Sequence, residues 1–137
     1  SMARALEAVR PPGARLTLIG HSGGGTLAML LAERVASVDA VVTIAGNLDL
    51  AAWARRHHYE PLSASLDPSA RAPLPPHIRQ LHFAGERDRE IPPQLVAAAA
   101  RRQPGARFEV RAGFDHACCW LHDWPGLLAP IVASSSR

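Results

Sequence analysis

The sequence predicts an α/β fold in which about four parallel strands form one sheet flanked by helices. Short, almost wholly apolar runs alternate with stretches of helical spacing along the chain. Strands of this kind are typical of a parallel sheet that is covered on both faces. The chain has 137 residues, 47% of them apolar, which suffices for one hydrophobic core and favours a single domain over residues 1–137.

The individual elements follow from local patterns. Apolar or β-branched runs predict four strands, at residues 16–19, 41–44, 80–84 and 108–110. Helical spacing predicts helices over residues 2–10, after the first strand through Leu27, Leu30, Leu31 and Val35, over 95–102, and after Asp123. Residues 47–76 do not fit this alternation, because they are long, contain five prolines and separate the second strand from the third. Such an excursion predicts a lid or a binding loop.

The segment Gly20-His21-Ser22-Gly23-Gly24 matches the pattern G-x-S-x-G and lies between a predicted strand and a predicted helix. This context places Ser22 at the apex of a strained turn, and Gly20 and Gly24 are expected to let strand and helix pass close together. The N-terminus of the helix directs free N–H groups at an oxyanion beside the serine, with Gly23 as the first donor. No lysine follows as in a phosphate-binding P-loop, so the segment is interpreted as a nucleophile turn.

A serine hydroxyl needs a base to become nucleophilic, and the base needs an acid to fix its tautomer. Asp88 follows the third predicted strand and His116 follows the fourth, so both lie at the sheet edge where the serine turn also projects. Asp49, after the second strand, is an alternative acid, because the ends of neighbouring strands are close enough for either carboxylate to reach the histidine. Asp88 is favoured, because residues 85–92 have the composition of a turn that delivers a carboxylate.

These segments, GHSGGG, GERDREIP and GFDHACCW, resemble those of the α/β-hydrolase superfamily, and the resemblance covers nearly all of the chain. It is strongest to uncharacterised bacterial α/β-hydrolases with an AGNLD segment after the strand that follows the elbow. The resemblance implies Ser22 as nucleophile, Asp88 as acid and His116 as base, with hydrolysis through an acyl-enzyme, most often of carboxylic esters. It implies no cofactor, and the substrate would be a small-molecule ester.

The chain departs from this superfamily at its start, since only about twenty residues precede Ser22 where the family places several further strands. We therefore expect a partial α/β-hydrolase fold that lacks the front half of its sheet and the second oxyanion donor. The strand at 16–19 would then be an unpaired edge, and a homo-oligomer that covers it is expected. The alternative to an active ester hydrolase is a non-catalytic or defective half-hydrolase that is stable only as an oligomer or beside a missing segment.

Other candidates carry less weight. Trp53, His57 and Tyr59 could line the pocket for the acyl or alcohol group, although a solvated helix face is the simpler interpretation. His116, Cys118, Cys119 and His122 form an H-x-C-C-x-x-H cluster, but adjacent cysteines rarely bind one ion together, so no metal site is predicted. The two cysteines are instead expected to be buried thiols beside Trp120.

Composition and charge exclude some classes of function. Fifteen basic and twelve acidic residues give a net charge of +3, and the paired arginines lie far apart without interleaved aromatic residues, which disfavours nucleic-acid binding. No apolar run approaches the roughly 20 residues of a membrane span, so a soluble chain is expected. The two adjacent cysteines cannot build a disulfide framework, so they do not identify the cellular compartment.

Overall fold

The structure, a computed structural model, describes residues 1–61 and 64–135. Its sheet contains four strands, all parallel, in the spatial order β1-β2-β3-β4. These are β1 (Leu16–His21), β2 (Val38–Ile44), β3 (Arg79–Gly85) and β4 (Arg107–Arg111). The predicted α/β class and the four predicted strands are therefore confirmed, each strand being longer than its apolar run.

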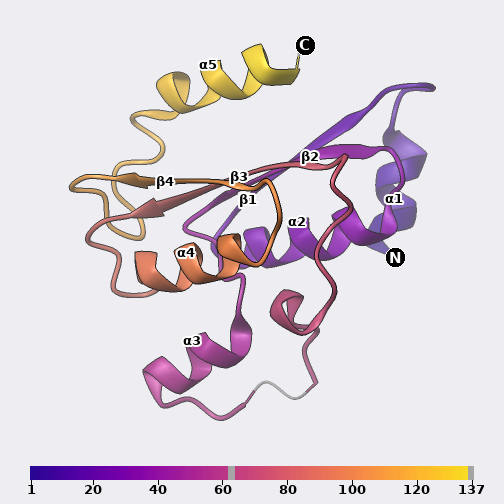
Figure 1. Cartoon of the computed structure of the whole chain (residues 1–137). Helices are drawn as coiled ribbons and strands as arrows, with labels where there is room; N and C mark the ends of the chain where they lie inside the picture. The colour runs from indigo at the N-terminus through magenta and orange to yellow at the C-terminus, as the bar shows by residue number, and fades with distance from the viewer. Residues whose placement is uncertain (62–63, 136–137) are drawn as a thin grey trace.

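Helices cover both faces of the sheet (Figure 1). One face carries α2 (Gly23–Arg34) and α4 (Pro93–Arg101), with α1 (Met2–Val9) beside α2. The other face carries α5 (Trp124–Ser135). The remaining helix, α3 (Leu50–His57), and the 3-10 turn η1 (Pro68–Ala70) lie beyond α2 and α4, on the side away from the sheet.

Two apolar clusters result from this arrangement. The larger one, between the sheet and α2 and α4, contains Met29, Val41, Ile78, Val96 and their neighbours. The smaller one, on the α5 face, contains Val42, Phe83, Trp120, Leu127 and Ile131 among others.

Helix α2 buries a different face from the one that its leucines suggest. Its buried residues are Gly25, Thr26, Ala28, Met29 and Ala32, whereas Leu27 is 46% exposed. Apart from Met29 these side chains are small, which suits a helix that starts immediately after β1 and runs close to the sheet.

Gly20 is the residue that allows β1 and α2 to approach each other so closely. A Cβ atom added to Gly20 would lie 2.1 Å from the backbone oxygen of Gly24, so no other residue fits there. The expectation for Gly24 is wrong, since a Cβ at that position meets nothing within 4 Å. The second close contact is made by Gly25, whose added Cβ would lie 3.0 Å from the Cα of Gly46 in the turn after β2.

Residues 47–76, the predicted lid-like excursion, contain α3 and η1, and residues 62 and 63 of the excursion lie outside the described residues. Two carboxylates hold the start of α3. Asp67 accepts hydrogen bonds from the N–H groups of Leu50 and Ala51, each at 3.1 Å, and Asp49 accepts one from Ala52 at 2.9 Å. Hydrogen bonds between residues of the excursion thus hold the start of α3 in place. The role of the excursion as a lid stays a prediction.

A chain of buried polar groups runs between the sheet and α4. His82, which has no exposed surface, accepts a hydrogen bond at Nδ1 from the Thr43 hydroxyl at 2.7 Å. Its Nε2 donates to the Gln80 side-chain oxygen at 3.0 Å. Gln80 in turn donates to Gln103 at 3.1 Å. Burial lowers the pKa of His82 from 6.5 to about 4, because the neutral ring is the form that the dry interior favours.

We expect His82 to make folding pH-dependent. The unfolded chain binds a proton at this ring below pH 6.5 while the folded chain does not until about pH 4, so stability falls as the pH falls through this window. The loss attributable to His82 should reach about 3 kcal/mol. Chemical denaturation of wild type and His82→Gln between pH 7 and pH 4 measures it, and the variant should lack this part of the decline. His77→Gln, at an exposed histidine, should keep the wild-type decline; an unchanged decline in His82→Gln would contradict the assignment.

Candidate active site

Ser22 lies between β1 and α2 in a conformation that few residues other than glycine adopt, with φ 54° and ψ −121°. Its backbone is fixed by bonds to the end of β2 and to the loop that follows: its N–H donates to the Ile44 carbonyl at 2.9 Å, and its carbonyl accepts from the Asn47 N–H at 3.1 Å. The hydroxyl makes no capping bond to α2. It is therefore free to point at the carboxyl edge of the sheet.

The side chains of Ser22, His116 and Asp88 form a continuous hydrogen-bonded series. Nε2 of His116 lies 3.0 Å from Oγ of Ser22, and Nδ1 lies 2.9 Å from Oδ2 of Asp88. A carboxylate oxygen can only accept, so Nδ1 carries the hydrogen and the bare Nε2 accepts from the serine hydroxyl. This is the tautomer in which the imidazole can take a proton from the serine.

Asp88 is held rigidly for this contact. Its side chain is fully buried against His116. Its other oxygen, Oδ1, accepts from the N–H groups of Glu90 at 2.9 Å and Ile91 at 2.8 Å, in the turn that leads to α4. The carboxylate thus has partners on both oxygens, and its free rotation is removed.

His116 lies in the segment between β4 and α5, residues 112–123, called here the His116 loop. Side-chain and backbone bonds tie its first half to the turn after β3: Gly113 donates to Glu86 at 3.0 Å, and Arg87 donates to the Phe114 carbonyl at 2.8 Å. Asp115 accepts from the backbone N–H groups of Cys118 and Ala117, and these two bonds hold the pKa of Asp115 below its usual range. Asp115 is thus a hydrogen-bond acceptor within the loop.

Gly23, the expected oxyanion donor, is the first residue of α2. An N–H in the first turn has no carbonyl partner within its helix, and the dipole of the helix favours negative charge there. The N–H of Gly23 lies next to Ser22 along the chain, which suits it to an oxyanion formed at the serine.

Asp49, the alternative acid, is engaged elsewhere. It caps α3, accepts from the Ser69 hydroxyl at 3.1 Å and pairs with Arg102 at 2.8 Å. Burial raises its pKa, but the hydrogen bond from Arg102, together with those from Ala52 and Ser69, outweighs burial and leaves the pKa below its usual value. The structure therefore brings Asp88 to His116 and Asp49 to α3.

Trp53, His57 and Tyr59, the predicted substrate-contacting residues, form one aromatic cluster. The Trp53 and Tyr59 rings are 5.1 Å apart, and His57 stacks on Tyr59 at 5.3 Å with an interplanar angle of 15°. Nε2 of His57 donates to the Glu90 carbonyl at 2.7 Å, two residues after Asp88. The cluster is thus attached to the turn that carries the acid.

Cys118 and Cys119 differ from expectation. They are joined by a disulfide, and Cys118 is exposed, so the prediction of two buried thiols is wrong. The loop here passes over the surface, and only the neighbouring Trp120 is buried, against Phe83 and Phe114. Among the described residues, no three histidine, cysteine, aspartate or glutamate side chains gather as a metal site.

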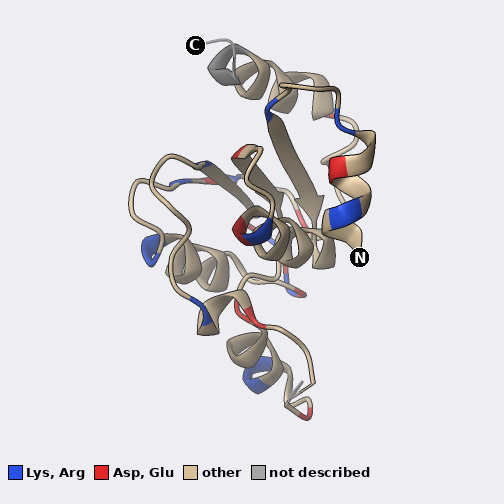
Figure 2. Cartoon of the chain, turned by 90° about the vertical axis from the view of Figure 1, so that its right-hand side faces the viewer, with Lys and Arg blue, Asp and Glu red and all other residues tan. Residues whose placement is uncertain are grey.

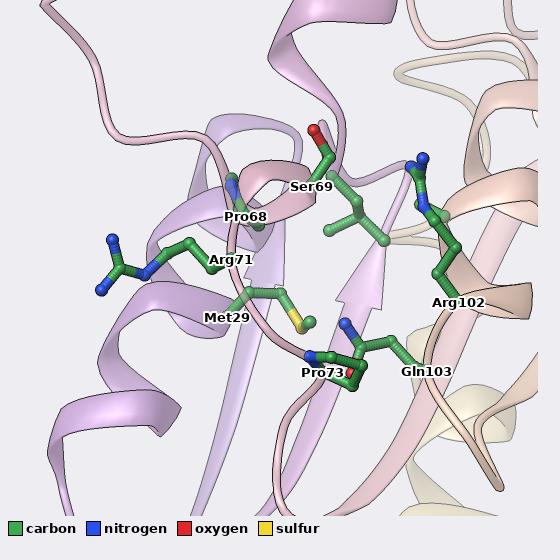
Figure 3. Close-up of a pocket in the computed structure, with 9 residues that line it drawn as sticks. Met29, Pro68, Ser69, Arg71, Pro73, Arg102 and Gln103 are labelled. Carbon is green, nitrogen blue, oxygen red and sulfur yellow. The ribbon is translucent and has the colours of Figure 1, made fainter.

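A separate pocket of about 320 Å³ lies between α2, α4 and η1 (Figure 3). Its lining is Met29, Leu48, Pro68, Ser69, Arg71, Pro73, Ala99, Arg102 and Gln103. Arg71 points away from the others, toward its ion-pair partner Glu33. The lining includes none of the Ser22, His116 and Asp88 series, so this pocket is distinct from the candidate site.

The distribution of charged residues and of apolar helices does not help to define the candidate site. Figure 2 shows acidic and basic residues spread over helices and loops on different sides of the chain. Within the part of the chain that the structure describes, no helix combines the length and apolar character that crossing a membrane requires.

The sequence matches no protein-family model and no curated protein significantly. The fold, in contrast, is similar to several solved structures. The esterase domain of a Rhodothermus marinus protein superposes with a TM-score of 0.64 at 20% identity, over 84% of this chain and 57% of that one. The mouse α/β-hydrolase domain-containing protein 10 superposes with a TM-score of 0.74 at 20% identity, over 98% of this chain and 66% of that one. A Mycobacterium tuberculosis puromycin-hydrolyzing peptidase superposes with a TM-score of 0.60 at 21% identity, over 85% of this chain and 21% of that one.

The chain thus spans less than two thirds of each of these three structures. The comparison with the mouse protein covers 98% of this chain, and those with the other two structures cover 84% and 85% of it. The part of this chain that is matched contains four neighbouring parallel strands with helices on both faces, and the turn of Ser22 between β1 and α2. The fold of this chain is that of the α/β-hydrolases, over the part of the fold that it contains.

Proposed function

We propose that the protein is a serine hydrolase that cleaves carboxylic esters through an acyl-enzyme. The observation that carries this proposal is the series in which Asp88, His116 and Ser22 are joined by hydrogen bonds of 2.9 and 3.0 Å. The strained backbone of Ser22 and the buried, doubly bonded Asp88 support it further, since neither is needed merely to form a helix cap.

In the proposed first half-reaction, Nε2 of His116 takes the proton of the Ser22 hydroxyl while Oγ bonds to the carbonyl carbon of the ester. The carbonyl oxygen becomes an oxyanion beside the N–H of Gly23. The His116 imidazolium, stabilised by Asp88, then donates its proton to the alkoxy oxygen, and the bond to the alcohol breaks.

In the second half-reaction a water molecule repeats these steps. His116 takes a proton from water, the hydroxide oxygen bonds to the acyl carbon, and the proton returns to Oγ as the acid leaves. The serine and the histidine end in their starting protonation states, so the proposed cycle uses water alone as co-reactant.

Contacts with the acyl or alcohol group are assigned in this proposal to Trp53, His57 and Tyr59. Their attachment to the turn of Asp88 through the His57 bond supports that assignment, as do their aromatic rings, which suit apolar ester groups. One similar structure is named an esterase and another a peptidase, so ester and amide substrates have to be compared directly.

Ser22→Ala tests the nucleophile. Turnover of p-nitrophenyl acetate and butyrate should fall by about 10⁴-fold or more, because the covalent step is lost. Ser37→Ala, at a hydroxyl that bonds Glu7 before β2, is the matched control and should keep wild-type turnover. Full activity in Ser22→Ala would exclude Ser22 as nucleophile.

Two further readouts separate ester hydrolysis from its alternatives. An alkyl fluorophosphonate should label wild type and spare Ser22→Ala; absence of both labelling and turnover would favour the non-catalytic half-hydrolase. Faster cleavage of a p-nitroanilide than of the matching p-nitrophenyl ester would contradict the ester preference.

Asp88→Asn against Asp49→Asn tests the acid. Asparagine at position 88 can present an N–H to the ring and favour the wrong tautomer, so kcat should fall by about 10⁴-fold. Asp49→Asn should change kcat by less than about threefold, because that side chain caps α3 and pairs with Arg102. A larger loss in Asp49→Asn than in Asp88→Asn would reverse the assignment.

We propose also that two copies of the chain associate through β1. This strand forms one edge of the sheet, its sequence LTLIGH lacks acidic residues, lysine and arginine, and Ile19 is 42% exposed. The opposite edge, β4, contains three charged residues in RFEVR, a feature that discourages edge pairing.

Sedimentation velocity over a range of concentrations tests the association. Wild type should shift toward a dimer as concentration rises, and Ile19→Lys should stay monomeric, since a charge on an edge strand opposes pairing. Val110→Lys places the same charge on β4 at a residue with 43% exposure and should dimerise like wild type. A wild-type protein that is monomeric at all concentrations would refute the proposal.

A further inference from the structure

The His116 loop has to carry the base across the whole sheet. It starts at β4, at one edge, and delivers His116 to Ser22 beside β1, at the other. Neighbouring strands lie about 4.8 Å apart, so three intervals correspond to about 14 Å. The bonds to Glu86 and Arg87 fix the loop near β3, well short of the serine. A second attachment near β1 would therefore limit how far the tip of the loop can move.

His21 provides such an attachment. Its Nε2 lies 2.9 Å from the backbone oxygen of His116, and the two rings are 5.1 Å apart with an interplanar angle of 40°. A carbonyl oxygen can only accept, so Nε2 of His21 carries the hydrogen and donates it. The residue directly before the nucleophile is thus bonded to the backbone of the base.

The orientation of His21 follows from the strand. Successive side chains of a strand point to opposite faces, and Gly20 faces α2, where its missing Cβ allows the close approach. His21 therefore faces the α5 side of the sheet, where the His116 loop passes. Its Nε2 is engaged with the His116 carbonyl, and the serine hydroxyl has Nε2 of His116 as its partner, so His21 is not the base of this series.

His116 is consequently bound at three atoms. Its backbone oxygen is held by His21, Nδ1 by Asp88 and Nε2 by Ser22. Within the loop, Trp120 donates to the Asp115 carbonyl at 3.0 Å, and the bond from His21 ties the His116 backbone to β1. Small displacements of a catalytic group lower the rate steeply.

We propose that His21 is a positioning residue, which keeps His116 at the distance from Ser22 that proton transfer requires by donating a hydrogen bond to the His116 carbonyl. The kinetic part of this inference rests on the proposed hydrolase function. It concerns the chemical step and not substrate binding, because His21 reaches the loop from β1 and makes no contact with the aromatic cluster among the described interactions.

The test compares side chains that keep or lose the donor. His21→Gln places an amide N–H at the same number of bonds from the backbone, whereas His21→Phe and His21→Leu have no donor. We expect kcat on p-nitrophenyl butyrate to fall about tenfold in the two donor-free variants with KM within about twofold, and the glutamine variant to recover to within about threefold of wild type. His122→Phe, at an exposed histidine of the same loop, is the control and should match wild type.

A second readout does not depend on turnover. The hydrogen on Nδ1 of His116 gives an imidazole N–H resonance in ¹⁵N-labelled protein, protected by its bond to Asp88. The resonance should be present in wild type, His21→Gln and His122→Phe, and broadened by exchange with water in His21→Phe and His21→Leu, while thermal unfolding shows that each variant is folded.

The two readouts separate failure of the inference from failure of the proposed function. Wild-type kcat in both donor-free variants, or an unchanged resonance in them, overturns the inference. An absent resonance in wild type also overturns it. A protein that shows the expected resonances but hydrolyses no ester would refute the proposed function and leave His21 as the residue that holds His116.

Discussion

The rest of the site depends on one steric constraint, the contact between β1 and the start of α2. With a Cβ at Gly20 only 2.1 Å from the Gly24 oxygen, strand and helix could not meet at this angle. Their contact forces the intervening Ser22 to a positive φ and lifts its hydroxyl out of the helix. A serine in an ordinary cap would turn that hydroxyl toward its own helix. Here the hydroxyl remains available to His116.

The three groups that meet at the sheet edge are held by different means. Ser22 is fixed by its backbone, Asp88 by two N–H groups of its own turn, and His116 by side chains from other elements. Local bonds suffice for Asp88, whose two donors are the next residues but one and two, and Ser22 is bonded to the neighbouring strand β2 and the residues that follow it. His116 lies five residues beyond β4 and has to reach β1, so its position depends on contacts between distant parts of the chain.

Much of the fold could be predicted from the sequence, because short apolar runs and glycine or proline boundaries are local signals. All four strands were found in this way, and the order of Ser22, Asp88 and His116 along the chain agrees with their meeting at one edge. The buried face of α2 could not be predicted, because Leu27 is left exposed by the neighbouring elements and not by its own spacing. The ion pair of Asp49 could not be predicted either, because its partner Arg102 is 53 residues away in the chain.

Helix α3 is attached at both ends, and this limits how residues 47–76 can move. Its start is joined to α4 through Asp49 and Arg102, and its end is joined through His57 to Glu90, just before α4. An outward swing about either end would have to break the bond at the other. The helix and α4 should therefore open together as one cooperative unit, and their amide hydrogens should exchange with similar protection. Tyr59 of the aromatic cluster is 51% exposed, so that side of the cluster is accessible to solvent without any such opening.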